Sequence, residues 1–257
     1  MAEHSGGVAP LSGRSGGPDG SPPVPDVVVL HVWGVRARMV PLAMGRMGLD
    51  RVLLRRSGPA RAGLTFTKLL GTGDGRTFTV RDADPFHWGL LTCWADSATA
   101  PLHSLEATPT VRGWDRIAHE RLRVVLRPLV SRGTWSGRQP FGDPRPRKVA
   151  GPVASITRAR LRPRLARTFW RAVPPVSADL QDVAGLRLAV GVGEAPVGLQ
   201  GTFSLWDDAR SLDEFAYRRA PHLDAVRRTA ELDWYAEELF ARFEVLSVDG
   251  TFAGQAP

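Results

Sequence analysis

The amino-acid sequence predicts an α+β protein made of two tandem ferredoxin-like (βαββαβ) domains whose sheets close on each other as a dimeric-type α+β barrel. Two observations support this prediction. Runs of β-branched and apolar residues alternate with segments of helical periodicity in the order βαββαβ, once in each half of the chain. In addition, three short segments recur in the same order in both halves.

The first half, residues 26–139, is predicted to hold one βαββαβ unit. Residues 1–25 precede it and are predicted to be a disordered tail, because they are rich in Gly, Ser and Pro without periodicity. The expected elements are, in order, a strand at VVVLHVWGV (27–35), a helix at RMVPLAMGRMGL (38–49), strands at GLTFTKLLGTG (63–73) and FHWGLLTCWAD (86–96), a helical region from about 97 to 119, and a strand at RLRVVLRPLVSRGTW (121–135).

The second half, residues 152–257, is predicted to repeat this order after a proline-rich linker at 140–151. Its expected elements are a strand at PVASITRARLR (152–162), a helix through ARTFWRAVPPVSADLQ (166–181), strands at GLRLAVGVGE (185–194) and LQGTFSLWDD (199–208), a helix from 209 to about 239, and a strand at ARFEVLSVDGTF (241–252).

The internal repeat rests on three collinear matches. The pairs are CWADSA (93–98) with LWDDAR (205–210), TPTV (108–111) with APHL (220–223), and GTWSG (133–137) with GTFAG (250–254). Each pair occupies the same place in its βαββαβ unit. Two sheets that each carry helices on one face would then bury their other faces against each other.

Composition limits the classes of function. The formal charge of +8 comes almost wholly from arginine, since Lys68 and Lys148 are the two lysines among 34 basic residues. These arginines are spread along the chain without a nucleic-acid motif, so no nucleic-acid partner is expected. The single cysteine, Cys93, excludes an internal disulfide and a cysteine-based zinc cluster. No apolar run approaches the roughly 20 residues of a membrane span, so a cytoplasmic protein without an integral membrane segment is expected.

His222 is the histidine with the most unusual setting. It follows Pro221, and proline either kinks a helix or opens one as its first residue. The repeat places Thr110 after Pro109 at the matching position of the first half, so the proline belongs to the fold and the imidazole does not. No HExxH, HxH or carboxylate cluster surrounds His222, which argues against a metal held by protein ligands alone.

A lone histidine suits a cofactor that brings its own equatorial ligands, namely haem. His222 would bind the iron, Phe215 and Val226 would supply apolar contacts, and the propionates would pair with nearby arginines. The candidate arginines are Arg218, Arg219 and Arg227. From these residues alone, a solvent-facing histidine on an arginine-rich helix stays the simpler interpretation.

The chain resembles the spheroidene monooxygenase family, the carotenoid-oxidising enzymes of purple bacteria and their relatives. Its most specific matching motifs are FSLW (203–206), PHLDAVRRT (221–229) and WYAEELFARF (234–243). The likeness continues upstream through KLLGTGDG (68–75) and RGTWSGRQPF (132–141), so that it spans nearly all of residues 27–252. Members of this family are similar to tandem dimeric α+β-barrel proteins.

The resemblance implies haem b as cofactor and molecular oxygen as oxidant, with His222 as the proximal iron ligand. It implies an apolar small-molecule substrate and an external electron donor. The arginine-rich composition makes spheroidene itself an improbable substrate, so an apolar or secondary-metabolite substrate is expected. A homodimer stays open, because tandem fusion already supplies both sheets of the barrel.

The distal side of such a site would need hydrogen-bond donors for iron-bound oxygen. Gln200, Thr202 and Ser204 share one face of a strand by period-two alternation, and Thr157 is expected on a neighbouring strand. Two alternatives to the oxygenase remain. One is a haem-dependent dehydratase or lyase acting on an N–O substrate, as in aldoxime dehydratase-like relatives, and the other is a non-catalytic barrel that carries haem or a lipophile.

Overall fold

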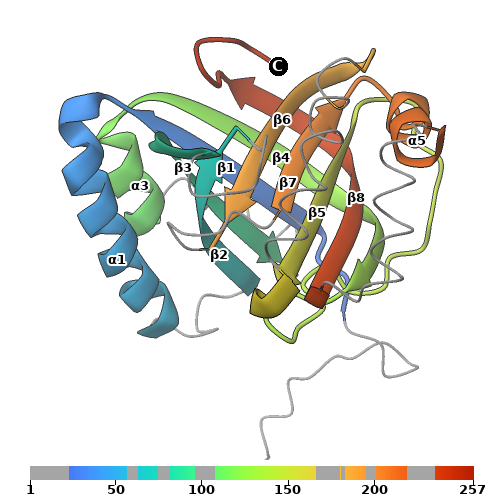
Figure 1. Ribbon diagram of the computed structural model, residues 1–257, viewed down its shortest axis with the longest axis horizontal. Coiled ribbons are helices and arrows are strands. Elements are labelled where there is room, and N and C mark those ends of the chain that lie inside the picture. Colours follow the sequence, from blue (N-terminus) through green and yellow to red (C-terminus); the bar gives the residue numbers. More distant parts are fainter. Residues whose placement is uncertain are drawn as a thin grey trace, which may run out of the picture.

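Eight strands of the computed structural model form one closed barrel in the order β1-β3-β2-β6-β7-β5-β8-β4 (Figure 1). The structure describes residues 23–56, 63–74, 82–95, 108–165, 180, 183–194, 201–218 and 235–257. Neighbouring strands are antiparallel throughout, and the helices lie outside the barrel. The predicted α+β class is therefore confirmed.

Within the described residues, the first half of the chain contributes four strands and two α-helices. They are β1 (Val27–Val35), α1 (Val40–Arg56) after a short 3-10 turn at Ala37–Met39, β2 (Leu64–Gly73), β3 (Ala83–Trp94), α3 (Pro109–Asp115) and β4 (Ala118–Gly133). Both helices lie on the same side of the barrel (Figure 1). Thr108 caps α3 by accepting a hydrogen bond from the Val111 N–H, and Pro109 is the first helical residue. The proline of TPTV therefore opens a helix.

The second half contributes the other four strands. They are β5 (Val153–Leu161), followed by a 3-10 turn at Pro163–Leu165, then β6 (Leu186–Gly193), β7 (Gly201–Trp206), α5 (Ala209–Arg218) and β8 (Tyr235–Gly250). Helix α5 covers the side of the barrel away from α1 and α3 (Figure 1). No helix among the described residues has the length and apolarity of a membrane span.

The two halves follow the same strand register. Val27 of β1 lies opposite Trp94 of β3, and Val153 of β5 lies opposite Trp206 of β7 in the same way. The halves join through two seams, β4 with β8 and β2 with β6. Because the register matches, each strand residue of the first half has a structurally equivalent residue in the second half.

Period-two alternation separates the barrel interior from its outer face. Inward residues of both halves form one apolar cluster, which includes Leu30, Leu91, Leu122, Phe203 and Phe243. Outward residues pack instead against the helices. Separate clusters lie under α1 and α3 and under α5.

Two predicted helices extend into residues that the structure places in strands, and the helix predicted at 38–49 runs on to Arg56 as α1. The region expected to be helical to residue 119 includes α3 only from Pro109 to Asp115, and His119 lies in β4; residues 96–107 lie outside the described part of the chain. The helix expected from 209 to about 239 ends as α5 at Arg218, and Tyr235 already begins β8. The buried residues 237, 239, 241 and 243 alternate along β8, which is the period of a strand.

Candidate functional site on the outer sheet face

Three of the predicted distal residues share the outer face of the second-half sheet. Thr202 and Ser204 alternate along β7 with Phe203 and Leu205, which belong to the barrel interior. The register places Thr157 of β5 directly opposite Thr202. The fourth predicted residue, Gln200, lies outside the described residues.

Ser204 is fully engaged in the packing of this sheet. Its Oγ accepts a hydrogen bond from Trp206 Nε1 at 2.8 Å and lies 2.8 Å from the Oγ of Ser155, its cross-strand neighbour. Both serines are buried. Ser204 therefore has a structural partner on each side, which leaves it little freedom to bind a ligand.

Thr157 and Thr202 differ from Ser204 in their surroundings. Thr157 is exposed and Thr202 half-buried, and no hydrogen bond joins either hydroxyl to another described residue. The two threonines are cross-strand partners, so their hydroxyls lie side by side on the outer face. Among the three predicted distal residues that the structure describes, they are the two that can still donate to a ligand.

The internal repeat shows that this face is built from unusually small side chains. Along the matching row of the first half, β2, β3 and β1 carry Leu69, Leu90 and His31. The counterparts on β6, β7 and β5 are Gly191, Thr202 and Thr157. One step along the strands, Trp33 of β1 corresponds to Ala159 of β5. We call Gly191, Thr202, Thr157 and Ala159 the small-residue floor.

Arg242 of β8 lies beside this floor, opposite Ser155, and was not singled out from the sequence. Its guanidinium bonds Asp213 of α5 at 2.5 Å through Nη1 and lies over the rings of Tyr217 and Phe240 at 5.5 and 5.6 Å. Its Nε and Nη2 atoms are buried without a partner in the described part of the chain. The sequence did contain a signal for Arg242. The alternating strand pattern places this arginine on the same face as the serines and threonines.

The predicted cofactor-binding residues fall partly outside the described chain. Phe215 packs in the cluster under α5, with its ring 5.6 Å from that of Trp206. Arg218 is the last residue of α5, and its side chain lies outside the described set. Four further predicted residues belong to the segment 219–234, which the structure does not describe: Arg219, His222, Val226 and Arg227.

Cys93 lies away from the outer sheet face. It lies in the apolar interior of the barrel, fully buried, and burial raises the pKa of its thiol. A protonated interior thiol is a poor metal ligand. Within the described ranges, no group of three or more His, Cys, Asp or Glu side chains could hold a metal ion by itself.

A second polar cluster lies inside one end of the barrel and was not predicted. Arg158 of β5 ion-pairs with Glu237 of β8 and with Glu194 at 3.0 Å, and Lys68 of β2 pairs with Glu194 at 2.7 Å. Trp135 donates its indole N–H to Glu194 at 2.5 Å. Arg160 also lies 3.8 Å from Glu237. The cations and carboxylates of this cluster pair with one another and join strands of both halves, so the cluster is structural.

Comparison with known proteins identifies the family. No protein-family model matches the chain. The spheroidene monooxygenase of Rhodobacter capsulatus is 34% identical over 212 residues, which cover 80% of this chain and 86% of that protein. The spheroidene monooxygenase of Rubrivivax gelatinosus is 39% identical over 194 residues, or 75% and 73% of the two chains. That of Cereibacter sphaeroides is 36% identical over 194 residues, which span 75% of this chain but 59% of the relative.

Solved structures with similar backbones are more distant. A crystal structure of aldoxime dehydratase has a TM-score of 0.49 at 13% identity, covering 85% of this chain and 80% of that one. Aldoxime dehydratase in complex with butyraldoxime has a TM-score of 0.49 at 12% identity, covering 88% and 82%.

The sequence identities place the chain among the monooxygenases, a class of oxidoreductase. It belongs to the spheroidene monooxygenase family, which confirms the resemblance found in its motifs.

Proposed function

We propose that this chain is a haem-dependent monooxygenase that uses O₂ and an external electron donor to oxidise an apolar substrate, either a carotenoid or another secondary metabolite. Family membership supports the reaction class, since the relatives are named for oxygenation of spheroidene. The observation that supports the site is the small-residue floor next to Arg242. The rest of the proposal follows from the chemistry of these residues.

The floor fits a planar, largely apolar group with acidic substituents. Gly191 and Ala159 replace the leucine and tryptophan of the first half, so a flat molecule can approach the strands closely. The buried Nε and Nη2 atoms of Arg242 lack partners among the described residues, and a carboxylate would satisfy them. A haem with its propionates has this combination of properties.

Each residue then has a distinct task. His222 would bind the iron, and Phe215 and Val226 would contact the macrocycle. Arg242 would hold a propionate together with one or more of Arg218, Arg219 and Arg227. When bound, haem supplies an iron that activates O₂. The protein positions the substrate, excludes water and provides hydrogen bonds.

Thr202 and Thr157 are the hydroxyls best placed to donate to an oxygen atom over the floor. Gln200 would join them from the same strand face, because it is two residues before Thr202. Ser204 would act indirectly, by fixing Trp206 and Ser155 under α5. Among the four predicted distal residues, substitution of Thr202 or Thr157 should therefore alter turnover most directly.

The barrel is best explained as two fused ferredoxin-like halves, residues 26–139 and 152–257, joined by the linker at 140–151. The shared register of β1 with β3 and β5 with β7 supports this division. In this arrangement the second half holds the haem. The first half completes the barrel, and a homodimer would form through surfaces outside it.

The cofactor is tested by absorption spectroscopy of the full chain expressed with a haem precursor. We expect a Soret band in the wild type, its shift or loss in His222→Ala, and weaker haem retention in Arg242→Met. His119→Ala is the matched control, since this histidine lies on β4 in the other half. A colourless wild type would refute haem, and an unchanged band in His222→Ala would refute His222 as ligand.

The reaction class is tested by turnover of an apolar carotenoid with and without O₂ and reductant. We expect product only when both are supplied, with oxygen from labelled O₂ in the product. Turnover of an aldoxime under anaerobic conditions would indicate a dehydratase instead. A chain that binds haem but turns over neither compound would be a carrier.

A further inference from the structure

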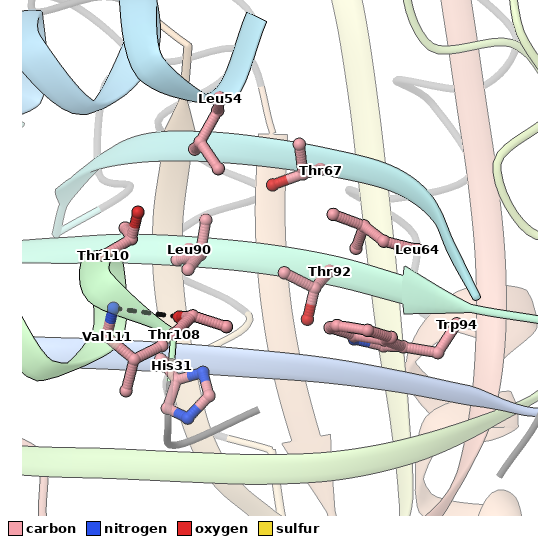
Figure 2. Close-up of a pocket in the computed structure, with 10 residues that line it drawn as sticks. All are labelled: His31, Leu54, Leu64, Thr67, Leu90, Thr92, Trp94, Thr108, Thr110 and Val111. Carbon is pink, nitrogen blue, oxygen red and sulfur yellow. Dashed lines mark hydrogen bonds between the residues drawn. The ribbon is translucent and has the colours of Figure 1, made fainter. Parts of the chain in front are cut away.

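Helix α1 presents apolar side chains on two opposite faces, and the sheet covers one of them. On the inner face, Ala43 and Met47 are buried against the sheet of the first half. Leu54 belongs to the same face and points toward the sheet (Figure 2). The pocket under Leu54 has room for about one water molecule, so helix and sheet are in close contact there. Packing on the sheet therefore accounts for the inner face of α1.

The opposite face of α1 is exposed to solvent. Of the nine large apolar residues that are exposed in the described part of the chain, five lie on this helix of 17 residues. Four of them are more than half exposed and form what we call the outer apolar face: Leu42, Met44, Leu49 and Val52. Figure 1 shows α1 at the edge of the molecule, on the side away from α5. A helix that is apolar all round is normally buried, so this face indicates a contact with something outside the fold.

The polar residues of this segment are almost all cationic. Residues 36–56 contain six arginines and one carboxylate. That carboxylate, Asp50, is buried and accepts a hydrogen bond from the indole N–H of Trp114 at 3.0 Å. Two arginines precede the helix and two end it: Arg36, Arg38, Arg55 and Arg56. The outer apolar face therefore lies between two cationic ends, on a chain whose formal charge is already +8.

The surface of a lipid bilayer with anionic headgroups matches both features of α1. Its acyl region accepts apolar side chains, and its headgroups attract arginine. A second copy of the chain would match the apolar face, but it would bring the arginines of both helices together, where like charges oppose association. Charge therefore favours the bilayer over a second copy.

We propose that α1 lies along the surface of an anionic membrane and holds the barrel there, with Leu42, Leu49 and Val52 in contact with the acyl chains. The arginines of the segment lie among the headgroups. The small-residue floor belongs to the other half of the barrel, so the membrane contact does not require haem. Transfer of an apolar substrate from the bilayer to the enzyme rests on the proposed function, whereas the membrane contact itself does not.

Flotation of the full-length protein with lipid vesicles tests the contact. We expect the protein to float with vesicles of phosphatidylcholine and phosphatidylglycerol, and much less with phosphatidylcholine alone. Salt should release it from the anionic vesicles, because ions screen the arginines. Cys93 is buried, so a polarity-sensitive fluorophore attached through Leu49→Cys would report on the outer apolar face. Its emission should increase when anionic vesicles are added.

Exposed leucines on two elements provide matched variants. Leu42→Gln combined with Leu49→Gln should weaken binding to the anionic vesicles about tenfold or more, because these side chains would no longer leave water. Leu246→Gln changes an exposed leucine of β8 and should leave binding unchanged. Arg36→Gln combined with Arg38→Gln should also weaken binding about tenfold or more and reduce its dependence on salt. All five side chains are exposed, so folding should be retained.

Three outcomes would overturn the proposal. The first is a folded wild type that does not float with anionic vesicles. The second is binding that the leucine variants leave unchanged, which would show adsorption by charge alone. The third is a dimer in sedimentation velocity that Leu42→Gln with Leu49→Gln dissociates, which would make a second copy the occupant of this face. A colourless protein that binds vesicles would refute the proposed function alone, and an active haem protein that binds none would refute the membrane contact alone.

Discussion

At the scale of single residues, His87 is the titratable group with the most specific surroundings. Its Nδ1 lies 2.5 Å from Asp84 and its Nε2 lies 3.0 Å from Glu120. The ring also packs on Phe252 at 4.6 Å. Burial opposes charge on the imidazole, but the hydrogen bonds to Asp84 and Glu120 outweigh it and raise the pKa of His87 above 6.5. The His87 side chain therefore connects β3, β4 and the C-terminal turn.

This raised pKa predicts a decrease in stability towards alkaline pH. The folded protein binds the His87 proton more tightly than the unfolded chain, so the stabilisation is complete below pH 6.5 and is lost as pH rises through the folded pKa. Allowing for solvent screening, the free energy of unfolding should fall by roughly 0.5–1 kcal/mol between about pH 5.5 and 8.5. Urea unfolding at both pH values would measure it.

His87→Gln should abolish this part of the pH dependence. The same decrease in stability in the variant would show that another group is responsible.

Acid also lowers the stability, through the two carboxylates that bind His87. The pKa values of Asp84 and Glu120 are lowered from 3.8 and 4.5, where burial opposes ionisation but the bonds to His87 and to backbone N–H groups prevail. The stabilisation that these two carboxylates give the folded protein is complete above their ordinary pKa values. It is lost as the pH falls through their lowered pKa values in the folded protein.

Some residues of the candidate site could be placed from sequence, and others could not. Period-two alternation puts Thr202 on the outer face, and the structure pairs it with Thr157 as expected. Arg242 lies inside the strand predicted at 241–252, but it was missed because its neighbours Ser155 and Asp213 come from elements distant in sequence. The clusters of His87 and Arg158 were missed because their partners come from strands distant in sequence.

At the scale of elements, two turns of matching sequence are fixed by two matching carboxylates. Glu237 accepts hydrogen bonds from the Gly137 N–H at 2.7 Å and the Thr134 hydroxyl at 3.1 Å, in GTWSG. Glu120 accepts from the Gly254 N–H and the Thr251 hydroxyl, both at 3.0 Å, in GTFAG. Each carboxylate thus holds the turn that follows a strand of the other half. The repeat matched these turns, but it could not reveal what binds them.

The two carboxylates should tolerate neutralisation to different degrees. Glu237→Gln leaves the guanidinium of Arg158 buried, with Glu194 as its remaining partner, and arginine cannot release its proton. Glu120→Gln leaves His87, which can deprotonate. We expect the free energy of unfolding to fall by about 2 kcal/mol or more in Glu237→Gln and by about 1 kcal/mol in Glu120→Gln. Urea unfolding at neutral pH would measure both values. If both variants lost the same free energy of unfolding, Glu194 alone would be sufficient to balance the charge of Arg158.

The element that sequence assigned least well is the region around α5 and β8. Residues 235–243 carry apolar side chains that fit a helical period as well as an alternating one, and the preceding helix signal made continuation plausible. Burial at 237, 239, 241 and 243 shows that pairing with β4 and β5 determines the conformation. Tertiary pairing therefore overrides local propensity here, because a strand completes the barrel and a helix would leave two edges open.

At the scale of the whole molecule, the barrel closes through two unequal seams. Strands β4 and β8 pair over eleven positions from Leu122 to Gly133, whereas β2 and β6 pair over three, at Gly71, Thr72 and Gly73. All but two of the six residues in the short seam are glycines. Few backbone hydrogen bonds and few side-chain contacts hold this seam, so local opening should begin there.

Hydrogen exchange of the intact protein would reveal this difference. Amides that hydrogen-bond across the short seam, at residues 71–73 and 191–193, should exchange about ten times faster or more than those that bond across the long seam. Glu194→Gln removes the 2.7 Å ion pair between Lys68 of β2 and the residue that follows β6, so it should accelerate exchange more at the short seam than at the long one. Equal exchange rates at both seams would show instead that the barrel opens only as a single cooperative unit, with the halves unable to separate along one edge.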